Sequence, residues 1–379
     1  MYNGRIYFDT NSTTPLNSSV IQKMNEMAGI PLNPSSIHSF GREARKVLEE
    51  AKVNICKLLN IDQKKYHVVF TSSGTEANNW VFKGLEEFIP VISAVEHISV
   101  LSSAGENKLI IKVDSNGIID LKHLEEILQT LKNENHKNVI ISVIYANNET
   151  GVIQPINEII EIAKKYGAIV HSDMIQAIGK TYVNFNELDL DLFTISAHKI
   201  NGPVGIAALF IKRNLPIKPM FVGGGQNQGL RAGTENVIGV IGLKTAIEEA
   251  ISNLNEYILH CKNLRDYIEE NIFSITKDAK FIGKNVERLP NTSSIYMPGV
   301  SNETQLISFD MESISVSAGS ACSSGRIAAS HVLIACGIGE QEAKNIIRVS
   351  LGIQNNKDEA DKFINLWRKI YENNQRKVA

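Results

Sequence analysis

The chain has 379 residues, of which 43% are hydrophobic and 21% are charged, and its formal net charge is −2 at pH 7. This composition indicates a globular protein of about two domains, and the weak net charge argues against nucleic acid or a membrane surface as a direct partner. No basic-then-apolar leader follows Met1, and no apolar run reaches the roughly 18 residues of a membrane span, so we expect a cytoplasmic protein.

Buried strand-like runs alternate with amphipathic helices along the first two thirds of the chain. The segment 40–59 carries apolar residues at helical spacing, so Cys56 within it is interpreted as a packing or surface residue. A helix over 157–166 ends at Gly167, which is a typical C-cap. Strands are predicted at 67–71, 90–95, 108–113, 138–145, 168–172, 190–196 and 204–211. The alternation predicts an α/β fold whose mostly parallel sheet is covered on both faces.

The pattern changes beyond about residue 250. It predicts one long helix over 243–272, short strands near 293–297 and 312–317, and a terminal helix from residue 357. These elements indicate a second, smaller α+β domain.

An acid and a lysine follow two strands that are neighbours along the chain. Asp173 ends the strand near 168–172, and Lys199 closes the sequence Ser-Ala-His-Lys that begins at Ser196. Ligands of open α/β sheets bind beyond the carboxyl ends of the strands. Pyridoxal phosphate (PLP) needs an amine for its Schiff base and a carboxylate for its pyridine nitrogen. The pair therefore predicts a PLP site, although strand-end acids and His-Lys pairs also occur by chance.

Two segments rich in small residues are candidates for a phosphate site. Residues 70–77 run from a strand through a Ser/Gly turn into a helix, where free N–H groups can cradle a phosphate, although such turns more often serve only as N-caps. Residues 223–229 are rich in glycine but lack the Lys-Ser/Thr ending of a P-loop, so nucleotide binding is not expected there.

The cysteines at 56, 261, 322 and 336 form no Cys-x-x-Cys pair and are too sparse for a disulfide framework, so we expect no structural metal site. Cys322 differs from the others because glycines, serines and alanines surround it in 317–325. This setting favours an exposed, reactive thiol over a core residue. Since a free thiol is only a few per cent ionised at pH 7, the site must activate it.

Together these motifs resemble the group I cysteine desulfurases, the NifS/IscS-like branch of the class V aminotransferase superfamily. The loop 319–325 is the feature that separates group I from group II. The resemblance runs nearly end to end, through segments 33–38, 71–79, 96–100, 146–151, 173–176, 196–199, 223–236 and 315–333.

The resemblance implies a PLP-dependent transferase of fold type I with two domains. The large PLP-binding domain is expected over 15–256, with a mainly parallel seven-stranded sheet. The small α+β domain is expected to combine 1–14 with 257–379 and to carry the cysteine loop, at about 318–330.

Roles for the cofactor site follow from the same resemblance. Lys199 is expected to bind PLP covalently, Asp173 to pair with the pyridine nitrogen, Gln176 to bond the phenolic oxygen, and His97 to stack on the ring. Further cofactor contacts are expected from Gly74, Thr75, Asn148, Ser196 and His198. Of these, Thr75, Ser196 and His198 would hold the phosphate, joined by Thr234 from the other subunit of a homodimer.

Asn148 and Arg348 are expected to grip the substrate carboxylate, because a guanidinium suits bidentate binding. Each role has a plainer alternative: without the family context, His97 is a satisfied strand-end histidine and Arg348 a surface ion pair.

The implied reaction converts L-cysteine to L-alanine and leaves a persulfide on Cys322, with Lys199 or His97 moving the Cα proton. The sulfur would pass to an acceptor such as an iron-sulfur scaffold, a tRNA-thiolation enzyme or a cofactor pathway, and Cys322 could contact an iron-sulfur cluster. The rivals are a selenocysteine lyase, another class V aminotransferase, and a non-catalytic assembly subunit. The presence of Lys199, Asp173, His97 and Cys322 together argues against the last.

Several positions depart from the family pattern without removing a reacting group. Asn11-Ser12 replaces two small alanines near the expected entrance, and Ser73-Gly74 alters the phosphate turn. Val204, Ala207 and Ala329 replace a lysine, a glycine and a proline. These changes leave rate and partner choice open.

Overall fold

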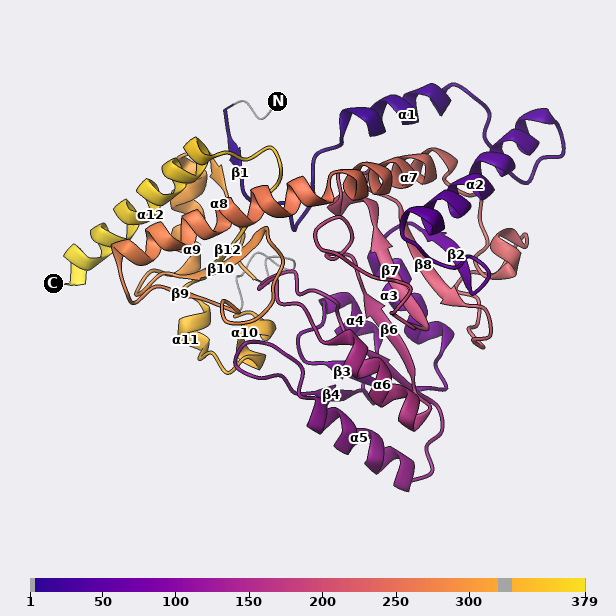
Figure 1. The fold of residues 1–379 in the computed structure, drawn as a ribbon, viewed down its shortest axis with the longest axis horizontal. Helices are drawn as coiled ribbons and strands as arrows, with labels where there is room; N and C mark the ends of the chain where they lie inside the picture. Colours follow the sequence, from indigo (N-terminus) through magenta and orange to yellow (C-terminus); the bar gives the residue numbers. More distant parts are fainter. Residues whose placement is uncertain (1–3, 320–328, 379) are drawn as a thin grey trace.

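The computed structural model describes residues 4–319 and 329–378. Its centre is a seven-stranded sheet in the order β2-β8-β7-β6-β5-β3-β4 (Figure 1). The strands are β2 (Tyr66–Thr71), β3 (Ile89–Ser93), β4 (Leu109–Ile111), β5 (Val139–Ser142), β6 (Ile169–Asp173), β7 (Leu192–Ser196) and β8 (Ala207–Lys212). Only β8 runs antiparallel to its neighbours in this sheet. The predicted mainly parallel α/β sheet is confirmed, and each predicted strand is present in it.

Helices cover both faces of the sheet, which explains why its strands are apolar on both sides. Helices α3 and α4 pack on one face, and α2, α5, α6 and α7 on the other. Helix α1 packs beside α7. The bounds of these helices are α1 (Ser18–Ala28), α2 (Ser39–Leu58), α3 (Gly74–Gly84), α4 (Ile98–Ser103), α5 (Leu121–Asn133), α6 (Ile156–Tyr166) and α7 (Val237–Ser252). Among the described residues, no helix has the length and apolar character that crossing a bilayer requires.

Two local predictions for this part are confirmed. Helix α2 matches the predicted segment, and Cys56 is buried in it, where burial raises the pKa of its thiol to about 11. Helix α6 ends at Gly167, whose φ of +68° is the left-handed conformation that favours glycine.

A second apolar core gathers the two ends of the chain (Figure 1). There Phe363 stacks on Phe309 and meets Phe8 edge-on. Its strands are β1 (Ile6–Tyr7), β9 (Lys280–Phe281), β10 (Thr292–Tyr296), β11 (Ile314–Ser315) and β12 (Ile346–Ser350). Its helices are α8 (Leu254–Ile275), α9 (Asn302–Met311), α10 (His331–Ala335), α11 (Glu340–Ala343) and α12 (Lys357–Val378). Short 3-10 turns occur at Ala197–Lys199 and Gln226–Gly229. The domain boundaries at residues 15 and 257 remain a prediction.

The prediction of one helix over 243–272 is wrong, because α7 ends and α8 begins at Asn253. The Asn253 side chain donates to the Glu249 carbonyl at 2.9 Å and closes the end of α7. The two helices then serve different cores: α7 packs on α1 and α2, whereas α8 packs on α12. Helical spacing of apolar residues on both sides of Asn253 hides this break from sequence reasoning.

The buried His171 on β6 predicts how stability depends on pH. Burial lowers its pKa to about 3, whereas an unfolded histidine titrates near pH 6.5. The unfolded chain therefore binds the proton first as the pH falls below 6.5, and the folded state loses stability. From pH 7 to pH 5, this one group should cost about 2 kcal/mol of unfolding free energy. Urea unfolding should show that the free energy of unfolding of His171→Gln falls by about 2 kcal/mol less than that of the wild type between pH 7 and pH 5.

The control for this prediction is His136→Gln, which removes an exposed histidine. It should keep the pH dependence of the wild type. Equal slopes for His171→Gln and the wild type would mean that His171 accepts a proton equally well in the folded protein.

Candidate active site

One cavity of about 530 Å³ lies at the carboxyl ends of β6 and β7 and is also lined from the second core. The predicted site residues that line it are Gly74, Thr75, His97, Asn148, Asp173, Gln176, Ser196, His198, Lys199 and Arg348. Within the described part of the chain, Thr234 is exposed and is not among the lining residues. Cys322 lies outside the described residues. The structure therefore brings the predicted set together except for these two.

Asp173 and Lys199 follow adjacent parallel strands. Asp173 is only 3% exposed, and its carboxylate accepts hydrogen bonds from the Asn78 side chain at 2.8 Å and the Ile175 N–H at 3.0 Å. The Lys199 Nζ donates to the carbonyls of Asn11 at 2.8 Å and Ser12 at 2.5 Å. Both groups are thus held by polar partners at the edge of the sheet where the sequence predicts a ligand.

His97 both caps α4 and lines the cavity. Its Nδ1 accepts from the Ser99 N–H at 3.1 Å, and it lies 2.7 Å from the Ser99 hydroxyl. Burial lowers the pKa of His97, with the Asp173 charge opposing this effect. Since a main-chain N–H can only donate, the neutral ring must carry its proton on Nε2. The Nδ1 of His97 thus has a hydrogen-bond partner, as the plainer interpretation of a satisfied histidine expects. That interpretation does not account for Nε2.

The start of α3 forms another part of the cavity wall. Ser73 is the N-cap and accepts from the Glu76 N–H at 3.1 Å, so the alternative of a simple cap describes Ser73 itself. A Cβ on Gly74 would lie 2.2 Å from the Ile175 side chain, so glycine lets the helix start pack against the turn after Asp173. First-turn N–H groups have no acceptor within the helix, and they favour an anion such as a phosphate.

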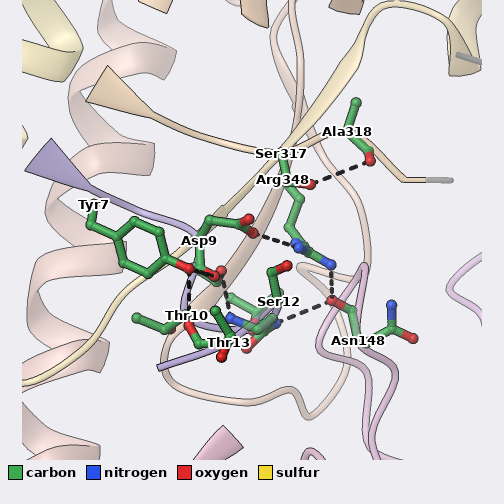
Figure 2. Close-up of polar contacts among 12 residues, drawn as sticks. Tyr7, Asp9, Thr10, Ser12, Thr13, Asn148, Ser317, Ala318 and Arg348 are labelled. Carbon is green, nitrogen blue, oxygen red and sulfur yellow. Dashed lines mark hydrogen bonds and ion pairs between the residues drawn. The ribbon is translucent and has the colours of Figure 1, made fainter. Parts of the chain in front are cut away.

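Arg348 projects from β12 and is 6% exposed, so the alternative of a surface ion pair is wrong. Figure 2 shows its guanidinium between Asp9, at 2.6 Å, and the Asn148 carbonyl, at 3.0 Å. Its Nε is buried and has no hydrogen-bond partner among the described residues. The Tyr7 hydroxyl lies 3.0 Å from the carbonyl oxygens of both Asp9 and Thr13, which share its one hydrogen, and it braces the same N-terminal segment (Figure 2). Each terminal nitrogen keeps a second N–H, and a guanidinium with such donors suits a carboxylate ligand.

The imidazole of His198 is held in the neutral form. Burial, followed by the charges of Lys199 and Lys180, lowers its pKa to about 4. Its Nδ1 lies 3.2 Å from the Thr13 hydroxyl. His198 thus offers hydrogen bonding, not positive charge, to a ligand at neutral pH.

The residues present fit PLP as a cofactor on the chemistry of the donor set. The cavity combines a buried carboxylate, a lysine amine, a helix N-terminus packed closely through Gly74, and the Arg348 guanidinium. These groups match the pyridine nitrogen, the aldehyde and the phosphate of PLP, and the carboxylate of an amino acid. Among the described residues, no group of His, Cys, Asp or Glu side chains is arranged to hold a metal ion.

Sequence reasoning missed several residues that shape the cavity. Asn78 and Ser99 hold Asp173 and His97, and Asp9 holds Arg348. Asn11 was interpreted as a departure near the entrance, yet it is 1% exposed and bonds several cavity residues. Lys180 is buried behind it. Asn78 lies in segment 71–79, which resembles the family, so the sequence could have indicated it as a site residue. No local sequence pattern indicates Lys180.

Comparison with known proteins identifies the family. The Aminotransferase class-V family model matches residues 6–363. Cysteine desulfurase IscS of Dictyoglomus turgidum is 37% identical over 380 residues, covering 97% of this chain and 94% of that protein. The X-ray structure of a NifS-like protein from Rickettsia africae is 39% identical, with a TM-score of 0.91 over 97% of this chain and 99% of the other. A structure of SspA in complex with cysteine is 27% identical, with a TM-score of 0.74 over 92% of this chain and 99% of the other. Since the sequence match and the fold match both run over nearly the whole length, this chain belongs to the class V aminotransferase family, in its NifS/IscS-like cysteine desulfurase branch.

Proposed function

We propose that the protein is a PLP-dependent cysteine desulfurase that converts L-cysteine to L-alanine and leaves the sulfur as a persulfide on Cys322. The observation that carries this proposal is the cavity that brings together Asp173 at the end of β6, Lys199 shortly after the adjacent strand β7, and the Arg348 guanidinium. The relatives named cysteine desulfurase, and the related structure in complex with cysteine, support the choice of substrate.

When bound, PLP supplies an electron sink for the bond changes at the substrate's Cα and Cβ. Asp173 would keep the pyridine nitrogen protonated, and Gln176 would donate to the phenolic oxygen. Lys199 would bind the cofactor through its amine and, once released by substrate, move the Cα proton. His97 is the weaker candidate for that proton, because its Nδ1 already accepts from Ser99 and its Nε2 carries the ring proton. We therefore assign proton transfer to Lys199 and ring stacking to His97.

Arg348 and Asn148 would orient the substrate by its carboxylate. Asp9 and the Asn148 carbonyl each accept one N–H of the two terminal nitrogens of the Arg348 guanidinium, so the second N–H of each nitrogen remains for an incoming oxygen. The Asn148 side chain lines the same cavity and can donate beside it. This arrangement would hold Cα at a constant position while its proton is removed.

Gly74, Thr75, Ser196 and His198 would surround the phosphate, since all four line the cavity with the first turn of α3. Thr234 is exposed and does not line the cavity of its own chain, so a contact with the phosphate would come from a second subunit. We therefore propose a homodimer with composite sites.

The sulfur transfer balances without an external oxidant. The Cys322 thiolate would attack the substrate sulfur, so that an S–S bond forms as the Cβ–S bond breaks. The electron pair stays with the carbon framework, which gains a proton and becomes alanine. The persulfide then awaits an acceptor protein such as an iron-sulfur scaffold, and a contact between Cys322 and a cluster is part of the same proposal.

We place this chemistry in the cytoplasm, without direct contact to nucleic acid or membrane. The described cysteines Cys56, Cys261 and Cys336 are free thiols, as expected in a reducing compartment.

The experiment that tests the function is a turnover assay with L-cysteine and a reductant but no 2-oxo acid. We expect equal amounts of alanine and sulfide from the yellow, PLP-loaded protein. A requirement for an oxo acid would favour an aminotransferase, and turnover of selenocysteine alone would favour a selenocysteine lyase. Failure of the protein to bind PLP would overturn the proposal.

A further inference from the structure

Lys180 is a buried lysine directly behind the cavity. Its side chain is 2% exposed, and its Nζ donates to Gln176 Oε1 at 2.5 Å and to Asn11 Oδ1 at 3.0 Å. Lys180 does not line the PLP cavity, whereas Gln176 and Asn11 do. Burying an amine costs free energy, and the positive charges of Lys199 and Arg348 add to that cost, so the pKa of Lys180 lies well below its ordinary value. The contacts of the Lys180 amine must therefore offset the free energy cost of its burial.

The contacts of Lys180 help to fix which way two amide groups face. Of the residues that the structure describes, Lys180 alone donates to Gln176 Oε1. It shares Asn11 Oδ1 with the Asn291 amide, which donates at 3.0 Å. Whether charged or neutral, its amine has the two N–H groups that the two amide oxygens use. With Oε1 held by Lys180, the Gln176 nitrogen turns to the other side and donates to the Asn11 carbonyl at 2.9 Å. With Oδ1 held by Lys180, the Asn11 nitrogen donates to the Asn148 carbonyl at 3.1 Å. Both main-chain carbonyls can only accept, so each amide has a single consistent orientation.

Two chains of hydrogen bonds therefore connect Lys180 to cavity residues. One chain runs through the Gln176 amide to the Asn11 carbonyl, which also accepts from Lys199. The other chain runs through the Asn11 side chain to the Asn148 carbonyl, which also accepts from Arg348. The Gln176 amide nitrogen has two N–H groups and uses one for Asn11, so the second remains for a ligand in the cavity.

We propose that Lys180 is a positioning residue that fixes the Gln176 amide with its nitrogen available to the phenolic oxygen of PLP. This inference rests on the proposed function, because it assumes that the cavity holds PLP. Without the Lys180 amine, Gln176 Oε1 loses its donor, and only the bond to the Asn11 carbonyl still orients the amide, so the amide is held less firmly. Lys180 therefore acts on the cofactor only through Gln176, which makes the proposal testable by combining substitutions.

The test is a double-mutant cycle on PLP binding to the apoprotein, followed by fluorescence titration. We expect Lys180→Met to raise the Kd for PLP by about tenfold, the value of one hydrogen bond, and Gln176→Ala to raise it by a similar factor. The double variant should bind no more weakly than either single variant, because both changes remove the same bond. The inference would be overturned if the increases in Kd of the two single variants multiplied in the double variant, or if Lys180→Met had the wild-type Kd.

Absorbance titration of the bound chromophore gives a second readout that a purely structural role would not move. A bond donated to the phenolic oxygen withdraws electrons from the imine, so its loss should raise the pH midpoint of the chromophore. Lys180→Met should raise that midpoint in the wild-type background and leave it unchanged in the Gln176→Ala background. A midpoint that still rises in the second background would mean that Lys180 acts by its charge, against the proposal.

A further variant covers the case in which Lys180→Met fails to fold. In Gln176→Glu, Lys180 still holds one oxygen while the other becomes an acceptor, so PLP should bind more weakly than in Gln176→Ala. Wild-type affinity in Gln176→Glu would contradict the inference. Lys164→Met, which removes an exposed lysine, is the matched control and should bind PLP normally. Loss of PLP binding in the wild type itself would instead refute the proposed function.

Discussion

Replacing Lys199 with alanine should abolish the formation of alanine and sulfide from cysteine, with a rate loss on the order of a thousandfold or more, because in the proposed mechanism one amine both holds the cofactor and moves the Cα proton. The variant should stay folded, since the Lys199 amine bonds two main-chain carbonyls at the cavity edge and fills no apolar core. It can still bind PLP through the other cavity residues, without the covalent bond. Reduction of the wild type with borohydride, followed by peptide mapping, should place the pyridoxyl group on Lys199.

A matched control is Lys164→Ala, which removes an exposed lysine and should leave turnover unchanged. Mixing Lys199→Ala subunits with Thr234→Ala subunits extends the test to the dimer. If Thr234 reaches across, each mixed dimer has one site that carries neither change, and activity should exceed that of both parents. A pyridoxyl group on another lysine would refute the assignment of Lys199, and no gain on mixing would place the Thr234 contact within one chain.

Much of the fold could be predicted because the central strands are buried on both faces. Runs such as 138–145 and 204–211 are mostly apolar and do not alternate with polar residues, and this pattern requires helices on both sides. The helix end at Gly167 was equally visible, since a left-handed C-cap selects glycine. The break at Asn253 was not, because one asparagine inside a helix costs at most about 0.7 kcal/mol relative to alanine and the two cores that separate α7 from α8 are tertiary features.

The site was only partly predictable for a related reason. Asp173 and Lys199 could be placed together because the carboxyl ends of adjacent parallel strands share one edge of a sheet. The pairing of Arg348 with Asp9 joins residues 339 positions apart, and Lys180 bonds Asn11 across 169 positions. No local pattern encodes such contacts. Asn11 appeared in the sequence as an exception to a family motif, and only the structure gives it a position among the cavity residues.

The described residues on either side of Cys322 meet at one acidic side chain. The Ser330 hydroxyl donates to Glu149 at 2.5 Å, and a Cβ on Gly319 would lie 2.4 Å from the same carboxylate. Gly319 also lines the PLP cavity. Gly319, three residues before Cys322 in the sequence, therefore lies at the cavity wall.

Replacing Cys322 with alanine should separate the two halves of that chemistry. In the proposed mechanism, Lys199 would move the Cα proton, whereas the Cys322 thiolate would attack the substrate sulfur. The variant should therefore bind PLP and still show a change in cofactor absorbance on mixing with cysteine. Release of alanine and sulfide should fall on the order of a thousandfold or more, as expected for loss of a nucleophile. Rapid-mixing absorbance and product analysis measure the two halves separately.

The remaining cysteines provide controls within the same chain. Burial raises the pKa of Cys56 to about 11, and of Cys261 and Cys336 to about 12, so these thiols stay protonated at neutral pH and are poor nucleophiles. Their alanine variants should keep activity, apart from a packing loss. Wild type treated with cysteine and no reductant should carry one extra sulfur atom on the peptide that contains Cys322, as measured by mass spectrometry. Wild-type turnover in Cys322→Ala, or extra sulfur on another cysteine, would exclude the desulfurase mechanism and favour a lyase or aminotransferase reaction that needs no thiol.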